Sequence, residues 1–152
     1  MSKKKILFPT DFSSHSDAGL KFAAALARDM NCELEIVHVL EEPTIYAGEF
    51  YYGNVEPDGD AVLKMLHAVK PDDPEVPFRH QLLRGDAAKA ICDHAGENEV
   101  DLIVMSTHGR TGLARLIMGS VAEYVVRKAT CPVLTFRGEA LQPDANVASA
   151  EV

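Results

Sequence analysis

Glycines, hydroxyl groups and two arginines gather in one stretch of this 152-residue chain, between residues 106 and 121. The stretch reads Ser-Thr-His-Gly-Arg-Thr-Gly-Leu-Ala-Arg-Leu-Ile-Met-Gly-Ser-Val. Glycine lets a backbone come close to a phosphate because it has no Cβ, and the first N–H groups of a helix carry partial positive charge toward an anion. Arg110 and Arg115 add cationic side chains. The stretch predicts a site for a phosphate-bearing ligand, and a simple turn followed by a helix cap is the alternative.

Other chemistry has little support in the residue pattern. Neither a Gly-Lys-Ser/Thr phosphate loop nor a compact Gly-x-Gly-x-x-Gly follows the first apolar run, where the chain has Pro9-Thr10-Asp11. Paired carboxylates at acid–base spacing and a supported Ser-His-Asp order are also missing. Five histidines are scattered without metal-ligand spacing: His15, His38, His67, His80 and His94. Three widely spaced cysteines are expected to be reduced thiols: Cys32, Cys92 and Cys131.

Strand and helix patterns alternate on both sides of the glycine-rich stretch. Apolar runs predict strands over residues 5–8, 34–39, 78–83, 100–105 and 131–136. Helical periodicity covers residues 18–30, 60–69, 87–96 and 119–129. Ser14 is expected to cap the first helix, and Asn31 to follow it in a left-handed conformation. Residues 138–152 have no apolar period and are expected to form a flexible tail.

This alternation predicts an α/β fold, a single-domain Rossmann-like open sheet of five mostly parallel strands with helices on both faces, over residues 1–137. In such sheets ligands bind beyond the carboxyl ends of the strands, where the strand order reverses. The loops that begin at Pro9, Leu40 and Ser106 are therefore the candidates for a binding site.

Charge and hydropathy exclude several classes of partner. The formal net charge is −8 and the isoelectric point is about 5.2, so nucleic-acid binding is disfavoured. The longest apolar runs, 22–27 and 102–105, are far shorter than the ~20 residues of a membrane span. Lys3–Lys5 is followed by only three apolar residues, too few for an export signal, and a cytoplasmic location is expected.

The spacing within residues 106–121 resembles the ATP-binding branch of the universal stress protein family. The family pattern is Gly, two residues, Gly, nine residues, Gly, then Ser or Thr, and Gly109, Gly119 and Ser120 take the last three places. Ser106 replaces the first glycine, where a Cβ would crowd a ribose or disfavour a positive φ. The resemblance covers about residues 3–137 and includes four further segments: 9–13, 36–39, 84–86 and 131–134.

The resemblance implies a site for ATP or another adenine nucleotide. The nucleoside would be framed by Pro9, Thr10, Asp11 and Val39, the last through its main chain. The phosphates would be held by Met105, Ser106, His108, Gly109, Gly119, Ser120 and Val121. A Mg²⁺ held through water near Asp11 is compatible with this site and not required by it. The resemblance also implies a homodimer joined through the closing strand, and a regulatory role, read by an unidentified protein partner, rather than an enzymatic one.

Two other functions are kept as alternatives. The first is a dimeric interaction module that has lost nucleotide binding, which the replacement of the pattern's first glycine by Ser106 keeps open. A slow ATP hydrolase or adenylating enzyme is the other, although adenylating folds usually carry a Ser-Gly-Gly loop where this chain has Pro9-Thr10-Asp11. The candidate residues have structural interpretations as well: Asp11 as a capping carboxylate, Val39 as a core side chain, and His108 as part of a turn.

Overall fold

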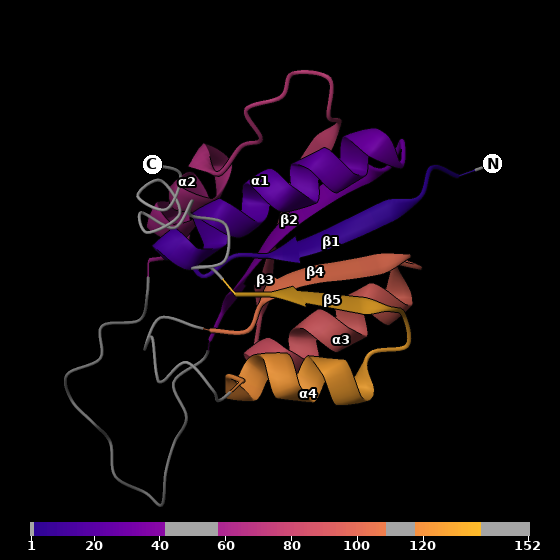
Figure 1. Cartoon of the computed structure of the whole chain (residues 1–152). Coiled ribbons are helices and arrows are strands. Elements are labelled where there is room, and N and C mark those ends of the chain that lie inside the picture. The colour runs from indigo at the N-terminus through magenta and orange to yellow at the C-terminus, as the bar shows by residue number, and fades with distance from the viewer. Residues whose placement is uncertain (1, 42–57, 109–117, 138–152) are drawn as a thin grey trace, which may run out of the picture.

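The computed structural model describes residues 2–41, 58–108 and 118–137. Strands and helices alternate along these residues (Figure 1), as the sequence predicts. The order is β1 (Lys5–Pro9), α1 (Ser14–Asp29), β2 (Glu33–Leu40), α2 (Gly59–Ala68), β3 (Phe78–Arg84), α3 (Ala87–Glu97), β4 (Leu102–Ser106), α4 (Ser120–Lys128) and β5 (Val133–Phe136). Gly109 and the expected tail lie outside the described residues.

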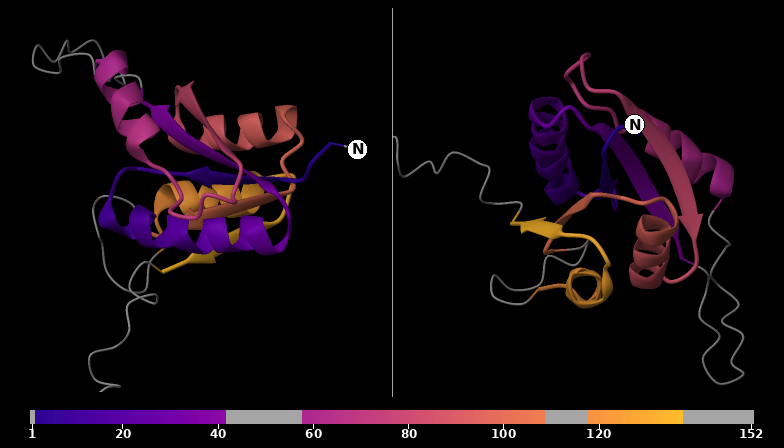
Figure 2. Two further views of the ribbon diagram at one scale, coloured as in Figure 1. Left: turned by 90° about the horizontal axis from the view of Figure 1, so that it is seen from above. Right: turned by 90° about the vertical axis from the view of Figure 1, so that its right-hand side faces the viewer.

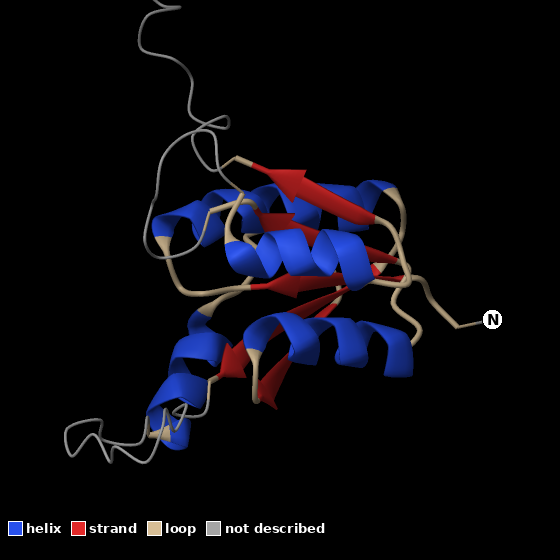
Figure 3. Cartoon of the chain, turned by 90° about the horizontal axis from the view of Figure 1, so that it is seen from below, coloured by secondary structure: helices blue, strands red, loops and turns tan. Residues whose placement is uncertain are grey.

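The five strands form one sheet in the order β3-β2-β1-β4-β5, and every neighbouring pair is parallel. Helices α1 and α2 cover one face, and α3 and α4 cover the other (Figures 2 and 3). The predicted Rossmann-like α/β fold is confirmed, with a sheet that is fully parallel over the described strands. None of the helices in this part of the chain is long and apolar enough to cross a membrane.

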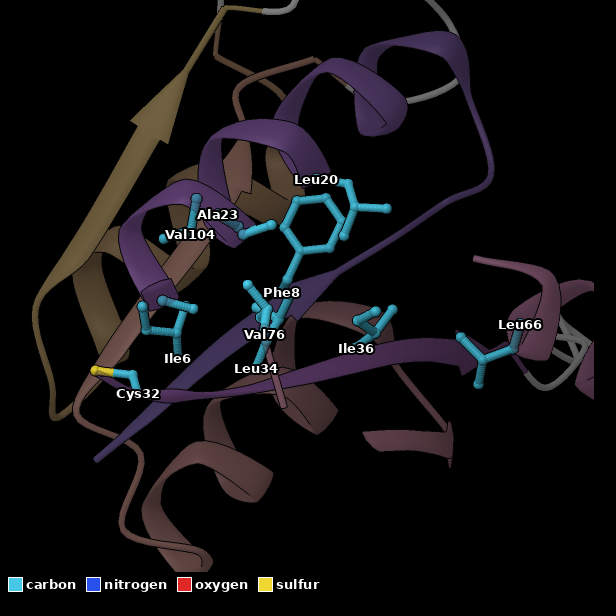
Figure 4. Close-up of a cluster of buried hydrophobic side chains, with 12 residues drawn as sticks. Ile6, Phe8, Leu20, Ala23, Cys32, Leu34, Ile36, Leu66, Val76 and Val104 are labelled. Atoms are coloured by element: carbon cyan, nitrogen blue, oxygen red, sulfur yellow. The ribbon is translucent and has the colours of Figure 1, made fainter. Parts of the chain in front are cut away.

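Two apolar clusters hold the helices to the sheet. Successive side chains of a strand point to opposite faces, so Ile6 and Phe8 of β1 pack toward α1 while Leu7 packs toward α3 and α4. Figure 4 shows the Phe8 ring beside Leu20 of α1. Because helices cover both faces of the sheet, the central residues of β1 and β4 are buried on both sides. Their sequences are therefore continuous apolar runs and do not alternate between apolar and polar residues.

The N-cap of the first helix lies one residue earlier than expected. Ser13, not Ser14, is the N-cap: its backbone is extended and its hydroxyl accepts the N–H of Ser16. The prediction of Ser14 was wrong because adjacent serines have equal capping preference, and the tertiary path of the chain decides between them. The left-handed conformation expected at Asn31 is confirmed, with φ of 54°.

A buried carboxylate ties α3 to the sheet. Glu35 of β2 is 2% exposed, and its two oxygens contact Arg79 Nη2 of β3 at 2.8 Å and His94 Nε2 of α3 at 2.6 Å. The hydrogen bond to Glu35 raises the pKa of the Arg79 guanidinium. His94 therefore has a structural partner, and no group of three potential metal-ligating side chains occurs among the described residues.

Candidate functional site

The strand order reverses between β1 and β4, the two adjacent strands at the centre of the sheet. From β1 the chain moves outward to β2 and β3, and it then returns to β4 and moves out to β5 on the other side. In sheets of this kind the connections leaving two such strands diverge at the carboxyl edge, and ligands bind between them; we call the space beyond the carboxyl ends of β1 and β4 the crevice. The sequence-predicted loops at Pro9 and Ser106 both begin at this crevice.

The turn after β1 is fixed by short hydrogen bonds. Thr10 is buried, its N–H donates to the Val37 carbonyl of β2 (2.8 Å), and its hydroxyl oxygen accepts the N–H of Phe12 (3.1 Å). Asp11 Oδ1 accepts from the Ser13 N–H (2.9 Å) and from the Ser16 hydroxyl (2.8 Å). The structural interpretation of Asp11 is thus supported: its carboxylate closes the turn that begins α1.

The end of β2 extends beyond the paired part of β1. The N–H of Glu33 donates to the carbonyl of Lys4, and the carbonyl of Val37 accepts from the N–H of Thr10. Lys4 and Thr10 flank β1, so the main-chain groups of odd-numbered residues of β2 face the β1 side. Val39 continues this alternation, but the pairing with β1 ends at Pro9 and Val37. The main chain of Val39 consequently faces the crevice, whereas its side chain lies in the core with α3.

The end of β4 turns on the hydroxyl of Ser106. This hydroxyl donates to the His108 carbonyl (3.0 Å) and accepts the His108 N–H (3.2 Å). Among the described residues, a positive φ outside glycine occurs only at Phe12, Asn31 and Glu99, so Ser106 has no such strain. A serine replaces the family's glycine here without backbone cost and supplies the hydroxyl that closes the turn.

Helix α4 starts at the same edge of the sheet. The N–H of Gly119 donates to the carbonyl of Thr107 (2.7 Å), which fixes the helix start beside the end of β4. Gly119 is the N-cap and has no side chain with which to cap the helix. The first N–H groups of a helix have no intrahelical partner, and their partial positive charge attracts anions. A helix start with a glycine N-cap beside the end of β4 can therefore accept a phosphate group.

Most of the predicted site residues meet at this edge. The described ones lie near or just beyond the carboxyl ends of β1, β2 and β4, or at the start of α4: Pro9, Thr10, Asp11, Val39, Ser106, His108, Gly119, Ser120 and Val121. The side chain of Met105 does not reach this edge, because it is buried in the core on the α3 and α4 side of the sheet. Gly109 lies outside the described residues.

Two histidines near the crevice were missed by the sequence reasoning, which gave them no role. His15, in the first turn of α1, has its ring centroid 6.3 Å from that of His108. His38 of β2 contacts the main chain of Thr10 and the ring of Phe12. No local motif identifies either residue, but a histidine inside an apolar strand such as β2 must find a hydrogen-bond partner, and this requirement marks His38.

The Thr107 hydroxyl orients the ring of His108 at the mouth of the crevice. It donates to the Phe136 carbonyl (3.3 Å), and its oxygen lies 2.9 Å from Nδ1 of His108. The crevice thus has main-chain groups of β2 on one side, and the amides of the α4 start with the His108 imidazole on the other. Such an arrangement suits a ligand with a polar planar group at one end and an anionic group at the other.

Comparison with known proteins places this fold in a family. Residues 3–137 match the model of the universal stress protein family. A universal stress protein of Methanocaldococcus jannaschii is 33% identical over 140 residues, covering 88% of this chain and 82% of the relative.

Two solved structures share the fold at lower identity. A universal stress protein in complex with cAMP superimposes with a TM-score of 0.66 at 20% identity, covering 91% of this chain and 99% of the other. A universal stress protein from Archaeoglobus fulgidus in complex with dAMP gives a TM-score of 0.61 at 21% identity, covering 89% and 98%. Because 3–137 of its 152 residues match the family model, this chain belongs to the universal stress protein family.

Proposed function

We propose that this chain binds an adenine nucleotide, with ATP as the expected ligand, in the crevice beyond β1 and β4. The observation that carries this proposal is the start of α4, which has a glycine N-cap and is held beside the end of β4 by the bond from Gly119 to Thr107. This arrangement directs helix amides at the point where a triphosphate would lie. The chain as a whole is acidic, so the attraction for phosphate has to come from such local groups.

The nucleoside would lie on the other side of the crevice. The main chain of Val39 faces that side, which suits hydrogen bonding to the edge of an adenine ring, and Pro9, Thr10 and Asp11 would border the ribose. Met105, Ser106, His108, Gly109, Gly119, Ser120 and Val121 would surround the phosphates. A Mg²⁺ accompanying ATP would be coordinated mainly by phosphate oxygens and water, as this cation prefers.

A regulatory role fits the site better than turnover. The Asp11 oxygen that accepts from Ser13 and Ser16 is a structural acceptor, so this carboxylate is poorly suited to activate water against a γ-phosphate. We therefore propose that the protein changes state with nucleotide occupancy, in the cytoplasm, and that a protein partner reads this state. The two family members solved with cAMP and dAMP support an adenine ligand for this fold.

Titration calorimetry with ATP, with and without Mg²⁺, tests the proposal. Wild-type protein should bind, and Gly119→Val should weaken ATP binding at least 100-fold, because a branched side chain would occupy the place of the phosphates. The matched control is Gly96→Val at the far end of α3, where a Cβ meets only the Thr130 hydroxyl at 3.9 Å. Gly96→Val should bind ATP normally. Absence of heat with the wild type, or normal binding by Gly119→Val, would contradict the proposal.

A further inference from the structure

His38 makes a hydrogen bond whose direction the geometry fixes. Its Nδ1 lies 2.7 Å from the main-chain carbonyl oxygen of Thr10. A carbonyl oxygen can only accept, so Nδ1 carries the proton and donates it.

The ring of His38 also packs on Phe12. The two ring centroids are 4.3 Å apart with an angle of 32° between the planes. Phe12 has φ of 65°, in the left-handed region, which residues other than glycine rarely adopt. The Phe12 N–H donates to the Thr10 hydroxyl oxygen (3.1 Å). Together these contacts hold Phe12 in a conformation that it would otherwise leave.

Asp11 lies between the two residues that His38 contacts. Thr10 precedes it and Phe12 follows it, so the backbone from which the Asp11 side chain projects depends on the conformation of both neighbours. Ser13 and Ser16 then hold its Oδ1. We infer that His38 is a positioning residue for nucleotide binding: it fixes the Thr10–Phe12 turn so that Asp11 faces the ribose side of the crevice. This inference rests on the proposed function. On this inference His38, which does not itself line the crevice, affects how tightly the nucleoside end of the nucleotide is bound.

Two substitutions at position 38 separate the hydrogen bond from the ring. His38→Phe keeps an aromatic ring to pack on Phe12 but cannot donate to Thr10. His38→Asn places an amide N–H near the position of Nδ1 and removes the ring. We expect His38→Phe to weaken ATP binding about tenfold, as the loss of about 1.4 kcal/mol would. His38→Asn should stay within threefold of wild type, and it also provides the test if His38→Phe does not fold.

A double-mutant cycle with Asp11→Ala distinguishes positioning from a general loss of structure. If His38 acts through Asp11, His38→Phe should change the ATP dissociation constant less than twofold once Asp11 is alanine. Calorimetry on the four proteins, each checked for its melting temperature, measures this coupling.

Additive losses in the cycle, an unchanged affinity of His38→Phe, or an equal loss in His38→Asn would each overturn the inference and leave the proposed function standing. Failure of wild-type protein to bind ATP would overturn both.

Discussion

Burial determines the chemistry of the three thiols. Cys32 is enclosed in the α1 side of the core, and Cys92 and Cys131 pack at the margin of the core on the α3 and α4 side. Burial raises the pKa of each thiol above its ordinary value, because the apolar surroundings disfavour the charged thiolate. Since the thiolate is the reactive species, all three cysteines should be poor nucleophiles near neutral pH.

Alkylation by iodoacetamide at pH 8 should therefore be at least tenfold slower for the folded protein than for protein unfolded in guanidinium chloride at the same pH. Mass spectrometry of peptides measures the rate for each cysteine. The same shifts bear on stability. A thiol with a raised folded pKa contributes fully below its unfolded value of about 8.5, and the contribution is lost as the pH rises through the folded pKa. A thiol that reacts in the folded protein at the unfolded rate would contradict this account.

At the level of single residues, the sequence predicted positions in the fold better than contacts. Gly119 lies at the start of α4 and Asp11 lies just after β1, and a glycine before a helix and an aspartate after a strand have local signals. The Ser106 hydroxyl closes its turn with a backbone of unstrained φ. The His38 ring contacts the carbonyl of Thr10, 28 residues away in the chain. Such contacts arise only once β1 and β2 are paired, so spacing within the sequence does not predict them.

Helix α1 and strand β5 come close together at one glycine. A Cβ built on Gly19 would lie 1.8 Å from Cζ of Phe136 and 2.5 Å and 2.7 Å from its two Cε atoms. The periodicity of the helix predicted its apolar face, but glycine inside a helix counts against helix formation by about 1 kcal/mol. The close approach of the Phe136 ring explains why glycine is present at this point.

Gly19→Ala should lower the free energy of unfolding by about 1 kcal/mol or more, because overpacking the contact outweighs the better helix propensity of alanine. In a Phe136→Ala background the clash is removed, and the same substitution should instead raise stability by up to about 1 kcal/mol. Urea denaturation of the four proteins measures both effects. An effect of the same sign in both backgrounds would show that Phe136 does not determine the residue at position 19.

Across the whole molecule, the alternation of strands and helices predicted a parallel sheet, because each crossover returns the chain to the same end. The order of the strands was not predictable in this way, since alternation does not fix which neighbour a strand chooses. The order found leaves β3 and β5 at the two edges. Strand β3 carries Arg79 and Arg84, whereas β5 is Val-Leu-Thr-Phe without a charge. Charged residues protect an edge from pairing, so β5 is the edge that favours a second chain.

A substitution at Thr135 tests this proposed dimer without breaking the sheet. The carbonyl of Pro132 accepts from Ile103 of β4, and that of Phe136 accepts from Thr107 just beyond β4. The main-chain groups of Val133 and Thr135 therefore point outward by alternation. Thr135→Pro removes an outward N–H and should therefore convert a dimer to a monomer. The mass should fall from twice 16.6 kDa to the 16.6 kDa of one chain, and the circular dichroism spectrum should be unchanged. Thr135→Val keeps that N–H and should stay dimeric. Light scattering that gives about 16.6 kDa for wild type, or a dimer for Thr135→Pro, would exclude pairing through the β5 edge.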